Sequence, residues 1–459
     1  MNSTVGSPTP AAPPPVAVPL RRIGLYAATA ITVGNIIGSG IFRSPHSVAQ
    51  QIEGLPGVLA AWIVGGLLSL AGSLVLAELA VAHPRTGGLY VFIREAFGDL
   101  WGFVFGLANL RVIEPTVIAS ITSVFALYFC EALHLAPQTQ FAVGAAAILV
   151  LTTINTLGVR EGAGTQSVFT TLKVIGIVLL CAAAFLLPHR GPDPSHAALA
   201  IPTMPPFVLG FVAAMISILF AYDGWTDSTY VAGEIKDPGR VLPIAILGGT
   251  VLVIVIYVLT NLAYYAVLSP AEMASIEAVG SETVRRVLGE PGAQALAVLV
   301  AISTFGTTNG AILTGPRVTQ AMAADGLLWR PAARLHPRRA TPDLALWIQA
   351  VLSIVWLGFS RGFEDVSGWF VTTSWLFYGL TTAAIFVHRR RARGGIEPVH
   401  PYRTPLYPLT PIVFVVVTVV LIVSDLSASG WRACAGVGIA ALGIPVYLVW
   451  KRKERKAYS

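Results

Sequence analysis

Uninterrupted apolar blocks constrain the fold of this chain more than any other feature of its sequence. The blocks are about 20 residues long, which is the length that an α-helix needs to cross a bilayer. Charged residues make up only 12% of the chain, and a soluble domain usually carries about twice that fraction. We therefore expect an all-α polytopic membrane protein with 12 transmembrane helices. The expected spans are residues 23–50, 56–82, 98–130, 139–159, 165–187, 207–233, 243–268, 292–322, 343–360, 366–388, 407–425 and 431–450.

The distribution of basic residues predicts the orientation of the chain. The net charge is +7, and with a cytoplasmic N-terminus 22 of the 30 lysine and arginine residues fall in inside loops or tails. Five fall in outside loops, and Arg43, Arg111 and Lys173 fall within spans. Cytoplasmic loops carry the excess of positive charge in membrane proteins, so both termini are expected in the cytoplasm. The basic residues are thus orientation signals and do not indicate nucleic-acid binding.

Four segments outside the spans have distinctive compositions. Residues 1–20 are rich in proline and alanine and should form a disordered cytoplasmic tail, and residues 451–459 should form a basic cytoplasmic tail. Residues 83–97 are amphipathic and should lie along the cytoplasmic face. Residues 269–289 have helical periodicity on the outside. They either cap an outer vestibule or form a surface helix with no gating role.

Two spans are interrupted by residues that weaken a helix. The first span carries Gly38 and Gly40, one residue apart, and the sixth carries Phe220-Ala221-Tyr222-Asp223-Gly224-Trp225. Non-helical backbone at membrane depth is tolerated only where it lines a cavity or faces protein. Glycines also permit close helix packing, which is the alternative explanation for each break taken singly.

Breaks in helices one and six of twelve favour two five-helix repeats of inverted topology, with the substrate held where the repeats meet. The repeats would comprise residues 21–200 and 201–392, followed by two peripheral helices in residues 393–450. The half-helix after Gly40 presents free amides and a positive dipole end, which suit a carboxylate. The half-helix before Asp223 ends in free carbonyls, which suit an ammonium group. Together they predict a site for a zwitterion such as an α-amino acid.

Three stretches resemble the amino acid–polyamine–organocation superfamily, most closely its L-type amino acid transporter branch and a bacterial-type permease. They are Gly34–Phe42 (GNIIGSGIF), Phe220–Glu234 (FAYDGWTDSTYVAGE) with the following IKDP, and Ser303–Gly310 (STFGTTNG) with Ala321–Gly326 (AMAADG). The resemblance covers residues 21 to 450. It implies a LeuT-like fold of ten core helices in two inverted repeats with two peripheral helices.

The resemblance also implies how a substrate is held. Its carboxylate would meet the amides around Ser39, Gly40 and Ile41, and its amine would meet carbonyls around Ile37 and from Phe220 to Asp223. The expected substrate-binding residues are Ile37, Gly38, Ser39, Gly40, Ile41, Phe220, Ala221, Tyr222, Asp223 and Gly224.

Lys173 matches the fifth-helix lysine of sodium-independent relatives, whose ammonium takes the place of a sodium ion. Its partners would then be carbonyls near Gly34 and hydroxyls near Ser303 or Thr304; snorkelling to the cytoplasmic surface is the alternative. Asp223 would favour a basic substrate, take part in proton coupling, or accept hydrogen bonds from the broken backbone. The expected gating or coupling residues are Lys173, Trp225 as an outer lid or a packing residue, Ser303, Thr304, Asn309 and Arg43 in the outer vestibule.

Arg111 and Glu114 are three residues apart on the third helix and are expected to pair on one face.

The expected function is sodium-independent amino-acid transport, preferably exchange, by alternating access. Proton-coupled symport and transport of polyamines or organic cations remain alternatives. A channel and a non-transporting amino-acid sensor are more distant ones. No pump, metalloprotease or nucleophile motif appears, and the three cysteines are too few and too scattered for a metal site, so neither an enzyme nor a cofactor or metal is expected.

The resemblance bears on partners and localisation as well. Members of the branch often pair with a heavy-chain glycoprotein through a cysteine between helices three and four. Residues 131–140 contain no cysteine and Cys130 lies at the helix end, so no such partner is expected. The short loops and the Ala/Arg-rich composition indicate a bacterial inner membrane.

Overall fold

The computed structural model describes residues 21–188, 191, 207–359, 363–396, 402–429, 438 and 440–458. The expected N-terminal tail and Cys434 lie outside these ranges. Within them the chain is helical, and the β-type contact recorded is a single parallel bridge between Ile23 and Ile235. The expected all-α architecture is confirmed for the described part of the chain.

Helices in the first part of the chain follow the expected spans closely. They are α1 (Leu25–Ile36), α2 (Gly40–Ala49), α3 (Leu55–Ala82), α4 (Leu89–Phe97), α5 (Asp99–Ala108), the π-helix η1 (Asn109–Ile113), α6 (Glu114–Ala132), η2 (Pro137–Thr139), α7 (Gln140–Leu157) and α8 (Val159–Leu186).

The second part begins with a short helix and a series of turns. Its elements are α9 (Phe207–Ala221), η4 (Asp227–Thr229), η5 (Ala232–Glu234), α10 (Pro238–Pro243), the π-helix η6 (Ile244–Gly248), α11 (Gly249–Val267), α12 (Pro270–Ser275), α13 (Val279–Thr314), α14 (Pro316–Ala324), η7 (Arg330–Ala333), α15 (Asp343–Phe359), α16 (Phe363–Arg393), α17 (Leu409–Ser429) and α19 (Gly443–Tyr458).

Eight helical stretches of the described chain are long and apolar enough to cross a membrane. Three shorter apolar helices, Leu209–Ala221, Asp343–Phe359 and Leu409–Ser424, coincide with the expected sixth, ninth and eleventh spans. The expected twelfth span is only partly described, and α19 continues through the basic segment to Tyr458. The polytopic membrane class is therefore supported by the lengths and apolar composition of these helices.

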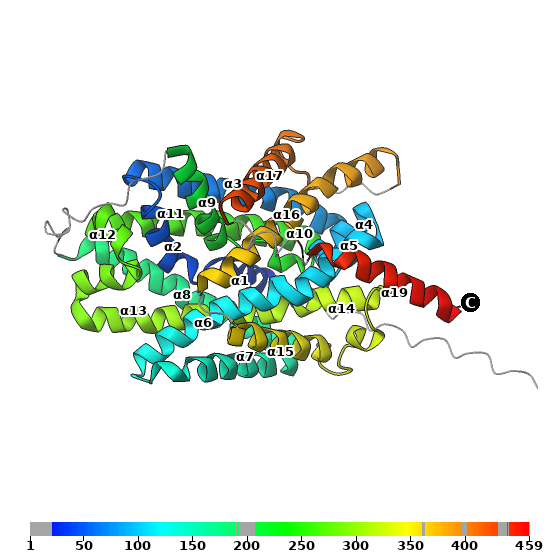
Figure 1. Cartoon of the computed structure of the whole chain (residues 1–459), viewed down its shortest axis with the longest axis horizontal. Coiled ribbons are helices and arrows are strands. Elements are labelled where there is room, and N and C mark those ends of the chain that lie inside the picture. Colours follow the sequence, from blue (N-terminus) through cyan, green and yellow to red (C-terminus); the bar gives the residue numbers. More distant parts are fainter. Residues whose placement is uncertain are drawn as a thin grey trace, which may run out of the picture.

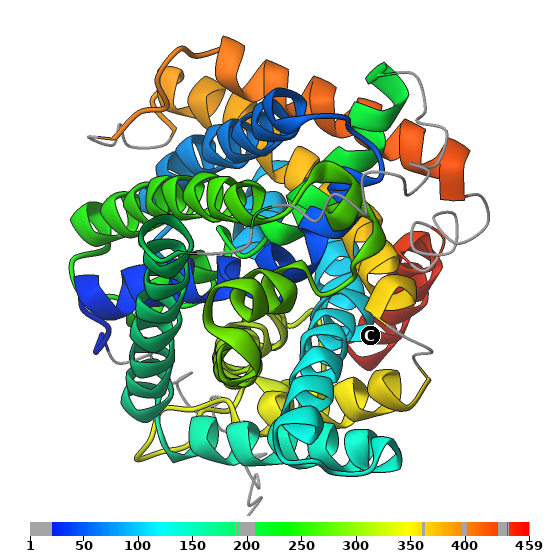
Figure 2. The same ribbon diagram turned by 90° about the vertical axis from the view of Figure 1, so that its left-hand side faces the viewer.

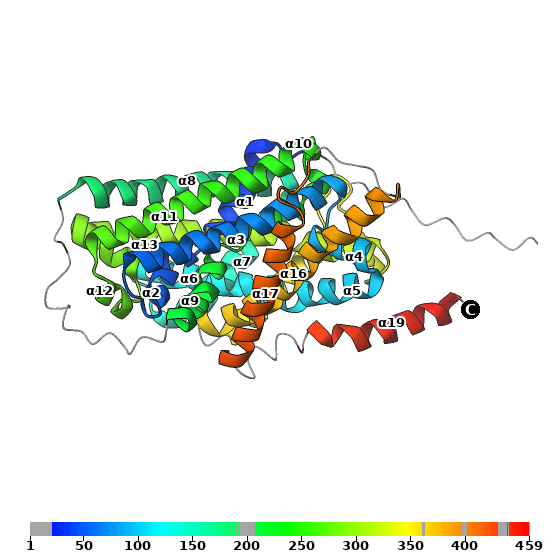
Figure 3. The ribbon, with the colours of Figure 1, turned by 90° about the horizontal axis from the view of Figure 1, so that it is seen from above.

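The two halves of the first span lie inside the bundle. α1 packs on α8, α13 and α11, while α2 packs on α9, α12 and α13, and Figure 1 shows both helices surrounded by longer ones. Viewed from the end at which α12 lies, Figure 2 shows helices on all sides of this interior. α19 touches α5 and runs along the edge of the bundle in Figure 3. The broken first span is thus shielded by protein, as its glycines require.

The segment at residues 83–97 differs from its expected surface position. α4 packs on α5 and α16, and its residues Leu89 to Ile93 are buried. Arg94 pairs with Asp99 and Asp325 at 2.8 Å each, and the Tyr90 hydroxyl donates to Asp325 at 3.0 Å. Burial, followed by the charge of Asp325, raises the pKa of Tyr90, so its hydroxyl stays a donor. α4 is therefore fixed to the bundle by buried apolar residues and by ion pairs.

The outer segment at residues 269–289 is helical, as its periodicity indicated. It forms α12, which begins with a capping box between Ser269 and Glu272, and the first part of α13. A kink at Gly289, with φ of 71°, separates that part from the expected eighth span.

Candidate substrate and coupling site

The first break separates α1 from α2 by three residues. Ile37 leaves the helical conformation with ψ of 86°, and α2 starts again at Gly40. The first amides of a helix have no partner within the helix. The expected site for a carboxylate, at the amides of Ser39, Gly40 and Ile41, therefore lies at the start of α2.

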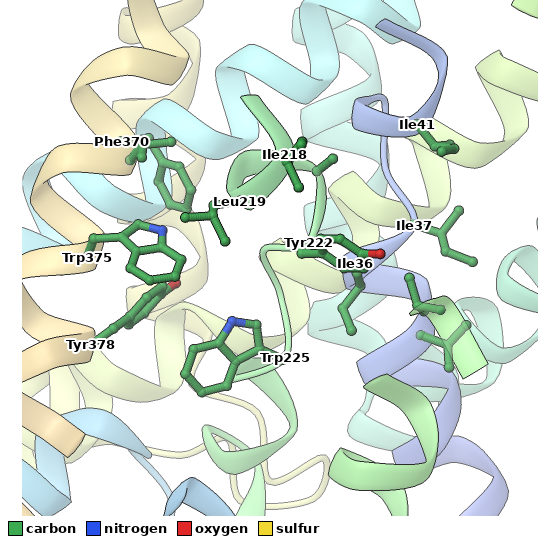
Figure 4. Close-up of a cluster of buried hydrophobic side chains, with 14 of the residues drawn as sticks. Ile36, Ile37, Ile41, Ile218, Leu219, Tyr222, Trp225, Phe370, Trp375 and Tyr378 are labelled. Carbon is green, nitrogen blue, oxygen red and sulfur yellow. The ribbon is translucent and has the colours of Figure 1, made fainter. Parts of the chain in front are cut away.

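The second break lies directly against the first. A Cβ atom added to Gly40 would lie 2.5 Å from the Cα atom of Ala221, and one added to Gly224 would lie 2.6 Å from the carbonyl carbon of Asn35. Gly224 has φ of +110°, a conformation that side chains rarely adopt. Figure 4 shows Tyr222 of the second break next to Ile36 of the first. The two breaks thus meet backbone to backbone, which explains the glycines in both.

A tyrosine hydroxyl links the two breaks. Tyr257 of α11 lies 2.9 Å from the carbonyl oxygen of Ile36 and 2.8 Å from that of Ala221. A hydroxyl carries one proton, so it donates to one of these carbonyls at a time. The Ile37 carbonyl, also expected to face a substrate amine, accepts from Lys173 and Thr307. Of the expected acceptor carbonyls, that of Ile37 is therefore already hydrogen-bonded within the protein, and that of Ala221 is whenever Tyr257 donates to it.

Lys173 of α8 is fully buried, with 0% of its surface exposed. Its ammonium donates to the carbonyls of Gly34 at 2.9 Å and Ile37 at 2.7 Å, and to the Thr307 hydroxyl at 2.7 Å. The expected contact near Gly34 is present, and the side chain does not snorkel to a surface. The three protons of the ammonium each have an acceptor, so the charge is bound to α1, the first break and α13.

The hydroxyl partner of Lys173 differs from the one expected. Thr307 takes that place, one helical turn after Ser303, while Thr304 bonds back to Val300 of its own helix at 2.7 Å. Ser303 reaches the Gly38 carbonyl at 3.5 Å. Asn309, the other expected coupling residue on α13, belongs to a separate network of buried amides with Asn155 and Gln166.

Asp223 lies at the second break and accepts a hydrogen bond from the Tyr378 hydroxyl of α16 at 2.7 Å. Trp225 is 2% exposed, and its ring centre lies 5.2 Å from that of Tyr378 and 6.0 Å from that of Phe414. Figure 4 shows Trp225 on the side of the second break away from Leu219. In this structure Trp225 packs among aromatic side chains.

Two further expectations concern charged residues within spans. Arg43 on α2 approaches Glu277 at 4.0 Å. Arg111 is exposed whereas Glu114 is buried, so the expected pair between them is wrong. The reason is that Arg111 lies in the π-helix η1, which changes the face of the third span on which each side chain lies. Glu114 instead lies against Gly315 and interacts electrostatically with Asp227 and Asp223.

A cavity of about 280 Å³ lies between the outer parts of α8 and α13. Its lining is apolar and includes no residue of either break, so it is not the candidate amino-acid site.

Comparison with known proteins decides the family. The family model described as amino acid permease matches residues 23–441, which span the two breaks and the lysine site. The chain belongs to the amino acid permease family.

This permease resembles several transporters over most of its length. It is 32% identical to the serine/threonine exchanger SteT of Bacillus subtilis, over 95% of this chain and 98% of the relative. It is 33% identical to the mouse b(0,+)-type amino acid transporter 1, over 84% of this chain and 79% of the relative. It is 32% identical to the human large neutral amino acids transporter small subunit 2, over 95% of this chain and 82% of the relative. The family and these relatives are transporters and not enzymes.

Several residues of the permease that contact the breaks were not selected from the sequence. Thr307 was detectable, because it follows Ser303 by one turn within the same motif. Asn35 lies inside the first-helix signature, but nothing in its sequence context indicates a partner. Asp227 and Tyr257 come from separate elements, and their approach to the breaks depends on the packing of the bundle.

Proposed function

We propose that this permease is a sodium-independent amino-acid exchanger that works by alternating access in the bacterial inner membrane. The observation that carries the proposal is the buried ammonium of Lys173, bonded to the carbonyls of Gly34 and Ile37 and to Thr307. A fixed cation at this point supplies the charge that a bound sodium ion would supply. The exchange mode is supported by the likeness to the serine/threonine exchanger.

The fold proposed with this function is LeuT-like, with 12 transmembrane helices in which residues 21–200 and 201–392 are inverted repeats and both termini are cytoplasmic. Contact between the first and second breaks supports it, because the discontinuous helices of such repeats meet at the substrate. In this arrangement relative movement of the repeats opens the site to one side and then the other.

The substrate proposed is an α-amino acid. Its carboxylate binds the amides of Ser39, Gly40 and Ile41 at the positive end of α2, and its ammonium binds carbonyls between Phe220 and Asp223. The Asp223 side chain belongs to the same break, where its oxygens are further acceptors for this ammonium. Gly224, with φ of +110°, allows the backbone conformation that the second break needs.

No heavy-chain partner is proposed. Cys130 at the end of α6 is 2% exposed and lies 3.5 Å from the Thr139 hydroxyl, so its thiol is not placed for an intermolecular disulfide. Proton-coupled symport is the second candidate, because Asp223 and Asp227 place two carboxyl groups inside the bundle, hydrogen-bonded to Tyr378 and Asn35.

Transport by the purified protein in proteoliposomes tests the proposal. A mixed panel of radiolabelled amino acids is offered with and without internal amino acid, sodium and a pH gradient. Exchange predicts uptake that is independent of sodium and rises when the lumen is preloaded. Uptake that requires a proton gradient but no preload would favour the symporter. Folded protein that takes up no amino acid under any condition would contradict the zwitterion site.

A further inference from the structure

Four buried carboxamides form a continuous chain of hydrogen bonds that ends on Asp227. Asn155 of α7 donates to Asn309 of α13 at 2.9 Å, and Asn309 donates to Gln166 of α8 at 3.3 Å. Gln166 donates to Asn35 of α1 at 3.0 Å, and Asn35 donates to the Asp227 carboxylate at 2.5 Å. This amide chain connects five elements that are far apart in the sequence.

The direction of the amide chain is set by the backbone. Asn155 also donates to the Leu151 carbonyl at 2.9 Å, and Asn309 to the Gly162 carbonyl at 3.2 Å. Carbonyl oxygens only accept, so the NH₂ groups of both side chains are identified. Every following amide must then accept from the previous one and donate to the next. Hydrogen bonds aligned in this way polarise one another, and their positive ends point at Asp227.

Three glycines make room for the amide chain. A Cβ atom on Gly310 would overlap the Asn35 amide and lie 2.8 Å from the Gln166 nitrogen. A Cβ atom on Gly34 would overlap the Gln166 amide, and one on Gly162 would overlap the Asn155 amide. The helices therefore approach one another at the points where these side chains cross.

The amide chain stabilises the charged form of the Asp227 side chain at a position that would otherwise disfavour a charge. Asp227 lies inside the bundle with only part of its surface exposed, and removal from water disfavours a charged carboxylate there. The Asn35 amide and the Thr226 hydroxyl, at 3.0 Å, both donate to it. A buried carboxylate requires such charge-assisted hydrogen bonds.

We propose that Asp227 is a positioning residue of the transport cycle. Held as a carboxylate by the amide chain, it fixes Asn35, and with it the end of α1, against α8 until the cytoplasmic side opens. This role rests on the alternating access proposed above, because α1 and α8 must separate for the inner half of the site to open. The bond between Gln166 and Asn35 is the one that then breaks.

A cysteine reporter on α1 measures this closure without requiring transport. In a protein whose three cysteines are replaced by serine, Ala30→Cys places a thiol on a residue that is 5% exposed. The rate of maleimide labelling in detergent then reports how often α1 separates from its neighbours. Asp227→Leu removes the charged end of the amide chain and should raise this rate about tenfold, the size expected from losing one buried hydrogen bond to a charged group. Gln166→Leu removes the link between α8 and Asn35 and should raise the rate as well.

A swap of Asn35 and Asp227, the last two groups of the hydrogen-bonded series, separates this role from general packing. In the double variant Asn35→Asp with Asp227→Asn, the carboxylate at position 35 accepts from Gln166 on one side and from the new amide on the other. Labelling should return to the wild-type rate. Asn261→Leu is the matched control, because Asn261 is an equally buried amide that bonds to the Tyr257 carbonyl outside the amide chain. The rate at which the thiol at position 30 is labelled should not change in this control.

The outcomes distinguish this inference from the proposed function. If the swap is labelled as fast as Asp227→Leu, or Asp227→Leu no faster than the parent, Asp227 has no positioning role. If the parent exchanges no amino acid but the swap restores slow labelling, the exchanger proposal fails and the positioning role stands. If Asp227→Leu does not fold, the single variant Asp227→Asn removes the charge with a smaller change and is compared with the swap in the same way.

Discussion

At the scale of single residues, Lys173 combines a high cost of burial with complete hydrogen bonding. Its ammonium has acceptors at Gly34, Ile37 and Thr307, and this offsets the removal of a charge from water. The same bonds use carbonyls that the first break leaves without a helical backbone donor. The lysine therefore stabilises the non-helical backbone as well as supplying a positive charge.

Replacing Lys173 by methionine should abolish most transport. The carbonyls of Gly34 and Ile37 lose a charged donor, and two such bonds correspond to a fall of roughly 100-fold in the rate of exchange. Thr307→Val keeps the ammonium and removes one hydroxyl, so a fall of about tenfold is expected. Initial rates in sodium-free proteoliposomes measure both. Exchange by Lys173→Met at the wild-type rate would show that the buried charge is not needed.

At the scale of elements, the two glycines of the first break have different neighbours. A Cβ atom on Gly40 would lie 2.5 Å from the Ala221 Cα atom, which is backbone and cannot turn away. A Cβ atom on Gly38 would lie 3.5 Å from the Thr307 methyl carbon, an ordinary contact. The closeness of α2 to α9 therefore depends on Gly40 far more than on Gly38.

Alanine substitutions at these two positions should give opposite results. Gly40→Ala should separate α2 from α9 and lower exchange by at least about tenfold, because overpacking typically costs about 1–3 kcal/mol. Gly38→Ala should keep at least about half of the wild-type rate, since its new methyl group meets only a normal contact. Both are measured as initial exchange rates at equal amounts of folded protein. Equal losses in the two variants would contradict the packing that the structure assigns to Gly40.

The same elements show what can be predicted from sequence. Apolar length located the long helices of the described chain, and the glycines located both breaks, because each depends on residues next to one another in the chain. Thr307 was missed in favour of Ser303 and Thr304, since the face that α13 turns to Lys173 is set by packing. The amide chain was missed because its members lie singly on separate helices. The π-helix η1 had no recognisable pattern, and it reversed the expectation for Arg111.

At the scale of the whole molecule, Glu234 joins three distant parts of the chain. Its backbone carbonyl accepts from the amides of Arg22 and Ile23, at 2.8 and 2.9 Å, where the first span begins. Its carboxylate accepts hydrogen bonds from the Arg317 guanidinium of α14 at 3.0 and 3.3 Å. The Glu234 side chain is 3% exposed and that of Arg317 is 1% exposed. The beginning of α1, the turns after the second break and the end of the eighth span are thus held together at one residue.

Breaking one side of this pair should cost more stability than removing both sides. Arg317→Met leaves the Glu234 carboxylate buried without its cation, which typically costs about 3–5 kcal/mol. Arg317→Met combined with Glu234→Leu removes both charges, and replacement of a buried ion pair by apolar residues is often neutral. The double variant should therefore unfold at a higher temperature than Arg317→Met in detergent. A double variant less stable than the single one would mean that Glu234 holds these segments through contacts other than its ion pair. The backbone bonds to Arg22 and Ile23 remain in both proteins, so the comparison isolates the contribution of the charges.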